Sequence, residues 1–444
     1  MITIVGAGMS GLALGHALAD EGQAFQILEA SPLPGGVIRT LHRDGHRMEL
    51  GPQRLRAVPA VTPFLDTIPC YRHEAGTLQV QVARHGRLHP LPTSLLQAAG
   101  TSAISFKGKL RGALEPLACL LPDREGQSAA QLLRRRLGDE IYRAFAGPLL
   151  GGLYGSDPEE MEASRTLIPA METMGMGSFI FRFLPRIQLK ARSQTGGSSL
   201  LDAPIVLPID GMEALPRSMA ADLFRRNPGR IALNCPVHRI ERLGGGGIRL
   251  ETEEGILESQ AVVLTTPPRI TAQLLDTIAP DAAQRLRALR VNDLALVHLQ
   301  VSSLPPSLGF QVALGEPQRI RGATFSGALD GTGDTAVVYL GGMLDPELVA
   351  LPDHEVMEIA TREFTSLTGL PSRPLHLHRT RMPAWDRSWE ALDGLTLPEG
   401  IHLLTNYTGR PGIVGRISQA GALARTHFGS GPDLPQATLR GQTP

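Results

Sequence analysis

Short apolar runs, a cluster of glycines and a helical pattern follow one another at the amino terminus of this chain. Ile2, Ile4 and Val5 predict a short buried strand, and the glycines after them lead into a run with helical apolar spacing. A second apolar run at residues 25–28 predicts the next strand. Strand, turn, helix and strand in this order are typical of a βαβ unit, in which the two strands are parallel.

The glycines before the helix have the spacing of a dinucleotide-binding turn. Gly6, Gly8 and Gly11 match G-x-G-x-x-G. The first glycine makes the tight turn, the second lets the backbone approach a pyrophosphate, and the third lets the helix pack closely on the strand. The pyrophosphate then meets the free amides at the amino end of the helix. Glu29 ends the second strand, where a carboxylate can accept hydrogen bonds from both ribose hydroxyls.

A similar pattern returns near the carboxy terminus. Residues 401–404 form an apolar strand-like run, glycines follow, and a helical pattern begins near Gly412. In the middle of the chain, a helical pattern is followed by successive strand patterns with a four-glycine hairpin, the last strand lying at residues 261–268. We therefore expect one discontinuous cofactor domain, built from residues 1–83, 201–268 and 386–444.

The segments between these pieces have other patterns. Residues 84–200 carry amphipathic helices, and residues 269–385 alternate helix with strand. We expect the first to be a helical subdomain and the second to complete a mixed α+β substrate domain with a sheet. Residues 179–192 interleave aromatic and basic side chains. Two interpretations of this stretch stay open: it lies on an anionic membrane surface, or it is a domain-packing helix broken at Pro185.

Composition excludes several classes of function. The 444 residues are enough for two or three domains, and a formal net charge of zero argues against nucleic acid as a partner. Three cysteines far apart make neither a disulfide framework nor a zinc motif, which indicates a reducing, cytoplasmic compartment. No leader peptide is expected, because the fold begins at Ile2, and no apolar run predicts a membrane span. His376 and His378 would share one face of a strand, but with no third ligand nearby in sequence we expect no metal.

A second glycine pair after Glu29 favours FAD over NAD, because NAD domains do not require it. The residues concerned are Gly35, Gly36, Arg39, Gly51 and Pro52. Here the chain resembles the flavin-containing amine oxidoreductase superfamily, whose signature continues past the acid with two glycines and an arginine. The common form places the arginine directly after the pair. This chain has Val37 there, a variant that is similar to the protoporphyrinogen oxidase branch.

The resemblance assigns further residues to FAD. In the family, the backbone of a valine meets the adenine, and a carboxy-terminal segment carries an asparagine and glycines before a helix whose first amide faces the flavin ring. The matching residues are Val237, Asn406, Gly409, Gly412 and Ile413. Thr405 is a departure, because relatives usually carry glycine there. The amino end of this last helix would point at the flavin end of the cofactor.

The resemblance also assigns two residues to the substrate. Gly152, in a Gly-apolar-aromatic turn, would lie against a flat porphyrinogen that leaves no room for a side chain. The alternative is a plain turn between helices. Trp385 replaces a tyrosine that the family places near the flavin, and core packing is the alternative. An arginine that relatives place against a propionate falls on Val80 here. Nearby arginines that would replace it are Arg54, Arg56, Arg84 and Arg87.

The resemblance implies an α/β enzyme with a glutathione-reductase-like FAD domain that oxidises protoporphyrinogen IX or coproporphyrinogen III, with dioxygen as acceptor, in haem biosynthesis. It also implies a ferrochelatase-type partner, and the membrane interpretation of residues 179–192 would place the protein peripherally on the inner face of a membrane. No catalytic base is identified, because the flavin carries the chemistry. Three alternatives stay open: a flavin amine oxidase, a carotenoid-desaturase-like enzyme, and an inactive flavoprotein that carries porphyrin. Amine oxidases usually hold a water with a lysine, and no lysine follows Lys190.

Overall fold

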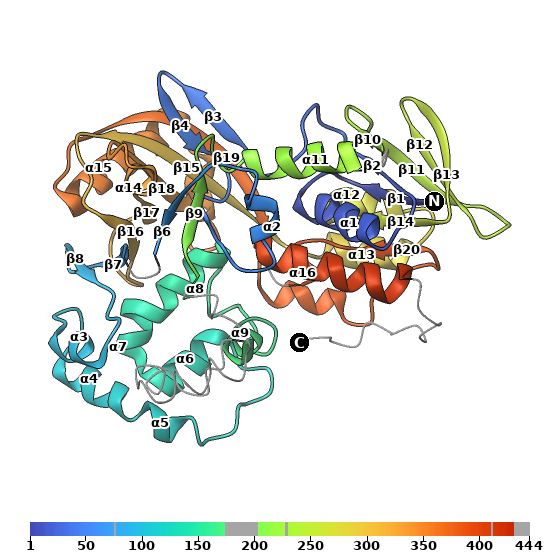
Figure 1. Ribbon diagram of the computed structural model, residues 1–444. Helices are drawn as coiled ribbons and strands as arrows, with labels where there is room; N and C mark the ends of the chain where they lie inside the picture. Colours follow the sequence, from blue (N-terminus) through green and yellow to red (C-terminus); the bar gives the residue numbers. More distant parts are fainter. Residues whose placement is uncertain (75–76, 174–202, 227–229, 410–411, 430–444) are drawn as a thin grey trace. The chain divides into compact units, whose positions relative to one another are not determined.

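The computed structural model describes residues 1–74, 77–173, 203–226, 230–409 and 412–429 (Figure 1). The chain forms two compact units, each built from segments that are far apart in sequence. The first unit contains Met1–Arg72, Ile205–Leu289 and Trp389–Gln442. The second unit contains His73–Pro204 and Arg290–Ser388. The chain therefore leaves the first unit twice and returns to it twice.

A parallel sheet of five strands forms the centre of the first unit. In spatial order the strands are β10 (Arg230–Ala232), β2 (Phe25–Leu28), β1 (Ile2–Val5), β14 (Ala261–Leu264) and β20 (Ile401–Leu403). Neighbouring strands are parallel throughout. Every residue of β1, β2 and β14 is buried, as is typical of strands covered on both faces. The predicted α/β fold, with a sheet assembled from both ends of the chain, is confirmed.

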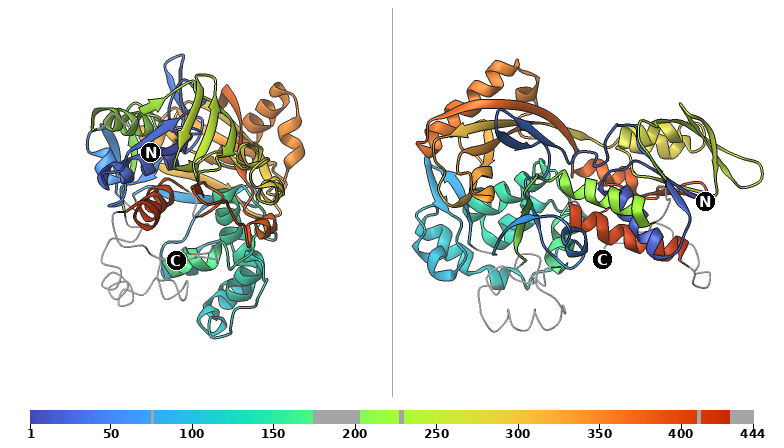
Figure 2. Two further views of the ribbon diagram at one scale, coloured as in Figure 1. Left: turned by 90° about the vertical axis from the view of Figure 1, so that its right-hand side faces the viewer. Right: turned by 45° about the horizontal axis from the view of Figure 1, so that its top comes forward.

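Helices pack around this sheet. α1 (Met9–Asp20) and α16 (Ile413–Leu423) pack against each other, although nearly the whole chain separates them in sequence (Figures 1 and 2). α11 (Ala214–Arg226) also packs on α1. The helical pattern predicted near Gly412 therefore returns the chain to the side of the first helix.

Smaller elements complete the first unit. An antiparallel meander of β11 (Val237–Arg242), β12 (Ile248–Thr252) and β13 (Gly255–Ser259) carries the predicted four-glycine hairpin. α12 (Pro268–Leu275) and α13 (Pro280–Arg287) follow β14. The remaining short elements are β3 (Thr40–Arg43), β4 (His46–Glu49), β5 (Leu55–Arg56), α2 (Thr62–Leu65), β6 (Cys70–His73), β9 (Ile205–Pro208), η4 (Arg387–Leu392) and η5 (Ala424–Phe428).

A mixed sheet of seven strands forms the centre of the second unit. In spatial order the strands are β19 (Ser372–Pro383), β15 (Val291–Val301), β18 (Thr335–Gly341), β17 (Ile320–Thr324), β16 (Ser307–Val312), β7 (Gln79–Arg84) and β8 (Arg87–Pro90). α15 (Asp353–Thr368) packs against this sheet. Phe310, Phe325 and Phe364 meet there with ring centroids 6.2 Å apart and form the centre of the core.

Short helices form a layer near β7 and β16 on the other face of this sheet. Ala83 and Val312 belong to the core on the α15 face, so the side chains next to them in sequence, Val82 and Ala313, point to the opposite face. There they pack against Ala144 and Phe145 of the helical layer. The helices are α3 (Leu95–Gly100), α4 (Phe106–Ala113), α5 (Glu115–Ala118), α6 (Ala129–Leu137), α7 (Asp139–Ile141), η1 (Tyr142–Ala146), α8 (Gly147–Tyr154) and α9 (Leu167–Thr173). α14 (Ser326–Asp330) and η3 (Pro346–Ala350) connect strands.

The structure divides the chain differently from the expected domain boundaries. β7 pairs with β16 and β8 pairs with β7, so both strands belong to the second unit and the first unit ends at Arg72 rather than at residue 83. The helical segment and the seven-stranded sheet share a core, so they form one unit rather than two domains. α12 and α13 stay with the first unit, whose middle segment ends at Leu289 rather than at residue 268.

The expected turn at residues 151–154 and the expected membrane-surface segment at residues 179–192 have different outcomes. Residues 151–154, expected in a turn, form the last turn of α8, and the chain turns at Gly155, which has a φ of +59°. Residues 179–192, expected at a membrane surface or in a broken helix, lie outside the described residues. Within the described part of the chain, none of the helices combines the length and the apolar character needed to cross a membrane.

Candidate cofactor and substrate sites

The glycines of the turn between β1 and α1 have different neighbours. The Gly6 amide donates to the Leu28 carbonyl over 2.7 Å, and Gly6 has a φ of +109°, which favours glycine. A Cβ on Gly11 would lie 1.9 Å from the Gly6 carbonyl oxygen, so only glycine lets α1 approach this closely. A Cβ on Gly8 would meet no atom within 4 Å. Gly6 and Gly11 therefore serve the packing of the chain itself, whereas Gly8 faces open space at the amino end of α1.

The second glycine pair lies against this turn. The Gly35 amide donates to the Ala7 carbonyl over 2.8 Å, and a Cβ on Gly36 would lie 3.4 Å from the Gly8 Cα. Gly35 and Gly36 have φ angles of +121° and +59°. The structure thus brings both predicted glycine segments into one patch of backbone without side chains.

The carboxylate of Glu29 connects this patch to the end of β2. Its Oε2 accepts a hydrogen bond from the Ala7 amide at 2.7 Å. Its Oε1 accepts from the amide and the hydroxyl of Ser31 at 2.9 and 2.6 Å. Two carboxylate oxygens offer about four acceptor positions, so these bonds leave room for a ribose hydroxyl. Glu29 therefore holds the glycine turn in place, a role that sequence analysis missed.

Arg39 and Gly51 shape the loop that carries the second glycine pair. The Arg39 guanidinium donates to the backbone carbonyls of residues 33 and 34, which closes the loop. A Cβ on Gly51 would lie 2.3 Å from the Val37 carbonyl oxygen, so glycine is required for this contact. Pro52 follows and is half-buried. In this structure, Arg39 and Gly51 act on the backbone of the loop.

Glu49 is a buried carboxyl that ties β3 and β4 to the segment before α11. Its Oε2 accepts from the Thr40 hydroxyl at 2.8 Å and from the Met212 amide at 3.1 Å. Burial raises the pKa of Glu49 to about 7, and these two hydrogen bonds oppose the shift. A Cβ on Gly211 would lie 2.5 Å from the Thr40 hydroxyl oxygen, so this segment packs closely on Thr40.

Thr265, at the carboxyl end of β14, is a further residue that sequence analysis missed. Its hydroxyl lies 2.8 Å from the Val5 carbonyl oxygen and 3.1 Å from that of Gly6, to which it donates. A Cβ on Gly6 would meet this hydroxyl at 2.6 Å. The carboxyl ends of parallel neighbouring strands share one edge of the sheet, where ligands of such folds bind. The end of the apolar run at residue 264 was the available signal.

The carboxy-terminal segment adds the amino end of a second helix. α16 begins after Gly412, which has a φ of +87°, and a Cβ there would meet no atom within 4 Å. Ile413 is the first helical residue. A Cβ on Gly409 would overlap the amide of Gln419, so Gly409 serves packing. Gly412 is therefore like Gly8, because each precedes a helix and faces open space.

Thr405, the departure from the family pattern, is accommodated inside its own loop. It is 1% exposed, and its hydroxyl lies 3.1 Å from that of Thr408. Asn406, which follows it, is exposed. The next residue, Tyr407, is fully buried, and its hydroxyl lies 2.7 Å from that of Thr271 at the start of α12. The loop before α16 is thus fixed by hydroxyl groups.

Val237 begins β11 close to the end of β2. The Cys235 amide donates to the Glu29 carbonyl over 2.8 Å, and the Asn234 amide donates to the Ser31 carbonyl over 3.1 Å. These bonds place the segment before Val237 beside the acid predicted to contact the ribose. That position fits the predicted contact with the adenine.

Two helix amino ends in the first unit favour a negatively charged ligand. Gly8 and Gly412 leave space at the amino ends of two helices, where backbone amides and the helix dipole favour negative charge. Arg416, one turn into α16, is a buried cation whose pKa is lowered to about 10 by burial. Sequence analysis missed this arginine, because its position in the helical pattern is that of an apolar residue.

Gly152 and Trp385, predicted at the substrate, have neighbours within the second unit. A Cβ on Gly152 would lie 2.4 Å from the side-chain oxygen of Gln311 on β16. Trp385 is 5% exposed and packs on Tyr154 with ring centroids 5.0 Å apart, and its amide donates to the Ser156 hydroxyl over 3.0 Å. Both residues therefore have packing roles, and their contact with a substrate stays a prediction.

A row of residues in register crosses the seven-stranded sheet on the face that meets α8. The row consists of Gln311 on β16, Gly322 on β17, Tyr339 on β18, Leu296 on β15 and His378 on β19. Gln311, Tyr339 and His378 are half-buried, and the Tyr339 hydroxyl lies 3.0 Å from that of Thr324. Hydrogen-bonding groups thus share a face although they come from distant parts of the sequence. No local pattern marks this row, which we call the sheet row.

His298 lies on β15 beside the histidine pair of β19. Its ring centroid is 6.3 Å from that of His376. Burial lowers the pKa of His298 to about 3, with the neighbouring histidines adding to the shift. In the part of the chain that the structure describes, no group of three or more His, Cys, Asp or Glu side chains is placed to hold a metal ion.

Comparisons with known proteins agree with this geometry. Residues 9–428 match the model of the flavin-containing amine oxidoreductase family. The chloroplast protoporphyrinogen oxidase of Nicotiana tabacum is 26% identical over 413 residues, which cover 83% of this chain and 72% of that protein. The coproporphyrinogen III oxidase of Bacillus subtilis is 24% identical over 405 residues, 84% of each protein. The structure of an oxidoreductase from Methanosarcina mazei has a TM-score of 0.70 and 17% identity, and covers 96% of this chain.

The family match begins at Met9, directly after Gly8, and covers nearly the whole described chain, including α1, the second glycine pair and α16. It explains why two helix amino ends and a patch of bare backbone lie in one unit, because a flavin dinucleotide needs both. The chain is therefore a member of the flavin-containing amine oxidoreductase family, an FAD-dependent oxidoreductase similar to the protoporphyrinogen and coproporphyrinogen oxidases.

Proposed function

We propose that this protein oxidises a porphyrinogen to the porphyrin in haem biosynthesis, with dioxygen as electron acceptor. The observation that carries the proposal is the match of most of the chain to relatives named for protoporphyrinogen and for coproporphyrinogen oxidation. FAD, when bound, supplies the hydride acceptor. The residues of the chain bind and orient the cofactor and the substrate. A ferrochelatase-type partner, which would receive the product, is part of the same proposal.

In this proposal the first unit holds FAD. Gly8 leaves room for the pyrophosphate at the amino end of α1, and Glu29 accepts a hydrogen bond from the ribose. The backbone at Val237 meets the adenine. Gly412 and Ile413 present the amino end of α16 to the flavin ring.

The sheet row supports a substrate with hydrogen-bonding groups at its edge. Gln311 and Tyr339 would donate to the propionates of a macrocycle, with Gly152 beside Gln311. Val80, where relatives place an arginine, lies on β7 opposite Gly309 of β16, and it offers no charge. Arg84 donates to a backbone carbonyl and faces Glu140 at 3.6 Å, so it is engaged in packing.

The test is to mix the flavin-loaded protein with each porphyrinogen without oxygen and to follow the flavin absorbance. Bleaching, followed by porphyrin fluorescence when oxygen is admitted, is the expected result. The ratio of kcat/KM for coproporphyrinogen III and protoporphyrinogen IX then tests the preference, and we expect the four-propionate substrate to be slightly favoured. No bleaching with either substrate would leave the porphyrin carrier, and bleaching by amines alone would leave an amine oxidase.

We also propose that the protein attaches to the surface of an anionic membrane through its helical layer. Exposed apolar side chains recur every three or four residues from α4 through α5 to the residues after it, with exposed fractions between 47% and 80%. These side chains, which we call the exposed stripe, are Phe106, Leu110, Leu114, Leu117 and Leu121. Lys107 and Lys109 lie within it, and such a mixture of apolar and basic side chains fits an anionic lipid surface.

Flotation with vesicles tests this attachment. Leu110→Asn with Leu117→Asn should reduce the bound fraction on phosphatidylglycerol vesicles severalfold, because each substitution removes apolar area from the interface. Ile256→Asn, at an exposed apolar position of β13 in the first unit, is the matched control. Equal binding of both variants to the vesicles would contradict the proposal. If the wild type forms dimers and the double variant does not, the stripe binds a second copy of the chain instead.

A further inference from the structure

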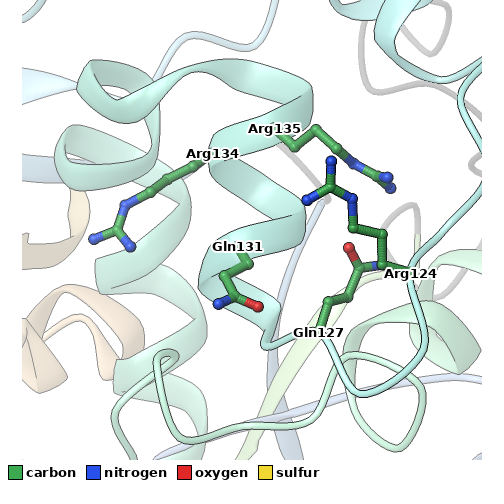
Figure 3. Close-up of a pocket in the computed structure, with 5 residues that line it drawn as sticks. All are labelled: Arg124, Gln127, Gln131, Arg134 and Arg135. Atoms are coloured by element: carbon green, nitrogen blue, oxygen red, sulfur yellow. The ribbon is translucent and has the colours of Figure 1, made fainter.

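A cavity in the helical layer of the second unit is lined by arginines and glutamines. Its volume is about 350 Å³, and its lining residues are Arg124, Gln127, Gln131, Arg134 and Arg135. Figure 3 shows Arg124 and Arg135 extending on the same side of α6, with Gln127 beside the base of Arg124. Every lining side chain can donate hydrogen bonds, and none carries a negative charge.

One glutamine that lines this cavity is buried and lacks a partner for its donor. Gln127 is 6% exposed, and its Nε2 has no hydrogen-bond partner within the described part of the chain. The Nε of Arg135 is also buried and also has no hydrogen-bond partner within the described part of the chain. Gln131 uses its Oε1 to accept from the Ser128 amide at 3.0 Å, which leaves its NH₂ group as a donor. Folded proteins seldom leave buried donors unused, so a missing acceptor is indicated.

The charges of the lining arginines are only partly balanced. The acids that pair with Arg134 and Arg135 are Asp123, Asp139 and Glu159. The Arg124 side chain, in contrast, has no ion pair or hydrogen bond with any other described residue. The cavity therefore combines donors from the loop before α6 and from α6 itself with one exposed arginine that has no ion pair to another described residue.

We propose that this cavity binds a phosphate group. A tetrahedral phosphate presents acceptor oxygens in several directions, which suits donors that come from a loop and from a helix, whereas a carboxylate presents two oxygens in one plane. The volume exceeds the roughly 30 Å³ that one water occupies in the liquid, so part of the molecule that carries the phosphate also fits. That molecule is a free phosphate ester or the headgroup of a phospholipid, because Leu117 and Leu121 of the exposed stripe precede Arg124 by only a few residues.

Titration of the flavin-loaded protein with inorganic phosphate at constant ionic strength tests the site. We expect heat of binding in a calorimeter and a raised melting temperature. Arg124→Gln should weaken the affinity roughly tenfold, because a charge-assisted hydrogen bond is lost. Gln127→Leu should weaken it similarly while the melting temperature of the phosphate-free protein stays the same or rises, since the substitution removes a buried donor without a partner. Arg362→Gln, at an exposed position on α15, is the control and should bind normally.

A second arm distinguishes the two sources of phosphate. Binding to phosphatidylglycerol vesicles that falls in Arg124→Gln and Gln127→Leu, but not in Arg362→Gln, supports a lipid headgroup. Vesicle binding that is unchanged in these variants, together with weakened binding of inorganic phosphate, supports a free phosphate ester. Either result sustains the site, and neither depends on porphyrinogen turnover.

Three results would overturn the proposal. Phosphate that causes no heat and no shift in melting temperature would show that the cavity holds no anion. Acetate that binds as tightly as phosphate at the same ionic strength would remove the phosphate assignment. Phosphate affinity that is equal in the wild type, Arg124→Gln and Gln127→Leu would place the anion elsewhere on the protein.

Discussion

The glycines predicted at the cofactor and the glycine predicted at the substrate differ in what surrounds them. Gly8 and Gly412 in the first unit face open space, whereas Gly152 in the second unit faces the side chain of Gln311 at 2.4 Å. Gly8 has a φ of −73°, so neither its backbone conformation nor the packing of the chain requires glycine there, which leaves the predicted ligand as the reason, whereas the φ of +87° at Gly412 also favours glycine. A glycine that faces its own chain is already explained by packing. The space around a motif glycine therefore distinguishes binding from packing, and Gly11 shows that both kinds occur within one motif.

The largest effects should come from substituting one glycine of each kind with valine. Gly8→Val should abolish FAD binding and leave the fold intact, because its side chain enters the space that the pyrophosphate needs. Gly11→Val should destabilise the fold itself, since a Cβ there would lie 1.9 Å from the Gly6 carbonyl oxygen. Flavin absorbance after gel filtration and thermal melting by circular dichroism measure the two effects. A Gly8→Val variant that keeps its flavin, or a Gly11→Val variant that melts normally, would break the comparison.

The next effect concerns the buried carboxyl of the first unit. The pKa of Glu49 is about 7 in the folded chain against an ordinary value of 4.5, so it stays protonated in the folded state while the unfolded state ionises. Its contribution to stability is complete below pH 4.5 and is lost as the pH rises to about 7. The loss is about 3 kcal/mol at 1.36 kcal/mol for each pKa unit.

Glu49→Gln measures this contribution, because glutamine does not titrate. The free energy of unfolding of the variant relative to the wild type should increase between pH 4.5 and 7, and it should be constant at higher pH. Urea unfolding at a series of pH values gives the difference. Asp44→Asn, which also replaces a carboxylate by an amide but at an exposed position in the turn between β3 and β4, is the matched control. A difference that is independent of pH would contradict the raised pKa.

Two tyrosines extend the comparison to smaller effects. Tyr407→Phe in the first unit removes a buried hydroxyl that is bonded to the Thr271 hydroxyl and the Thr266 carbonyl, which should cost about 1–2 kcal/mol of stability. Tyr339→Phe in the sheet row should cost less stability but should lower kcat/KM for porphyrinogen. Melting temperatures and kcat/KM of both variants, measured side by side, test the division of roles. Loss of stability alone in Tyr339→Phe would remove that tyrosine from the proposed substrate face.

The smallest effect should be at Gly152. Gly152→Ala should cost about 1 kcal/mol, because the new methyl group meets the flexible end of the Gln311 side chain. Gln311→Ala in the same chain should restore the melting temperature, since it removes the atom that is contacted. A double variant that melts as low as Gly152→Ala alone would show that packing against Gln311 is not the reason for the glycine.

The cofactor unit was more predictable from the sequence than the substrate unit. β1, the glycine turn, α1 and β2 follow one another within 28 residues, so their pattern is complete in one stretch of sequence. The carboxy-terminal strand and helix were predicted for the same reason, and the structure places β20 beside β14. Thr265 and Tyr407 were missed, because their partners come from other segments of the chain, and Arg416 was missed, because it takes a buried position in its helix. For the substrate site, Gly152 and Trp385 were selected by resemblance, and the structure gives both of them packing neighbours.

The sequence by itself determined that this protein binds a flavin dinucleotide. It also determined that the sheet of the cofactor domain contains strands from both ends of the chain. It did so because a glycine turn, a strand and a helix amino end are local features, set by the backbone of a few consecutive residues. Only the tertiary structure decided which motif glycines face open space, that the hydroxyl of Thr265 after β14 closes the first turn, and that Gln311, Tyr339 and His378 share one face of a sheet. Only the tertiary structure also gathered three arginines and two glutamines around a cavity. These features depend on the register of distant strands and on the packing of separate helices, which no single stretch of sequence records.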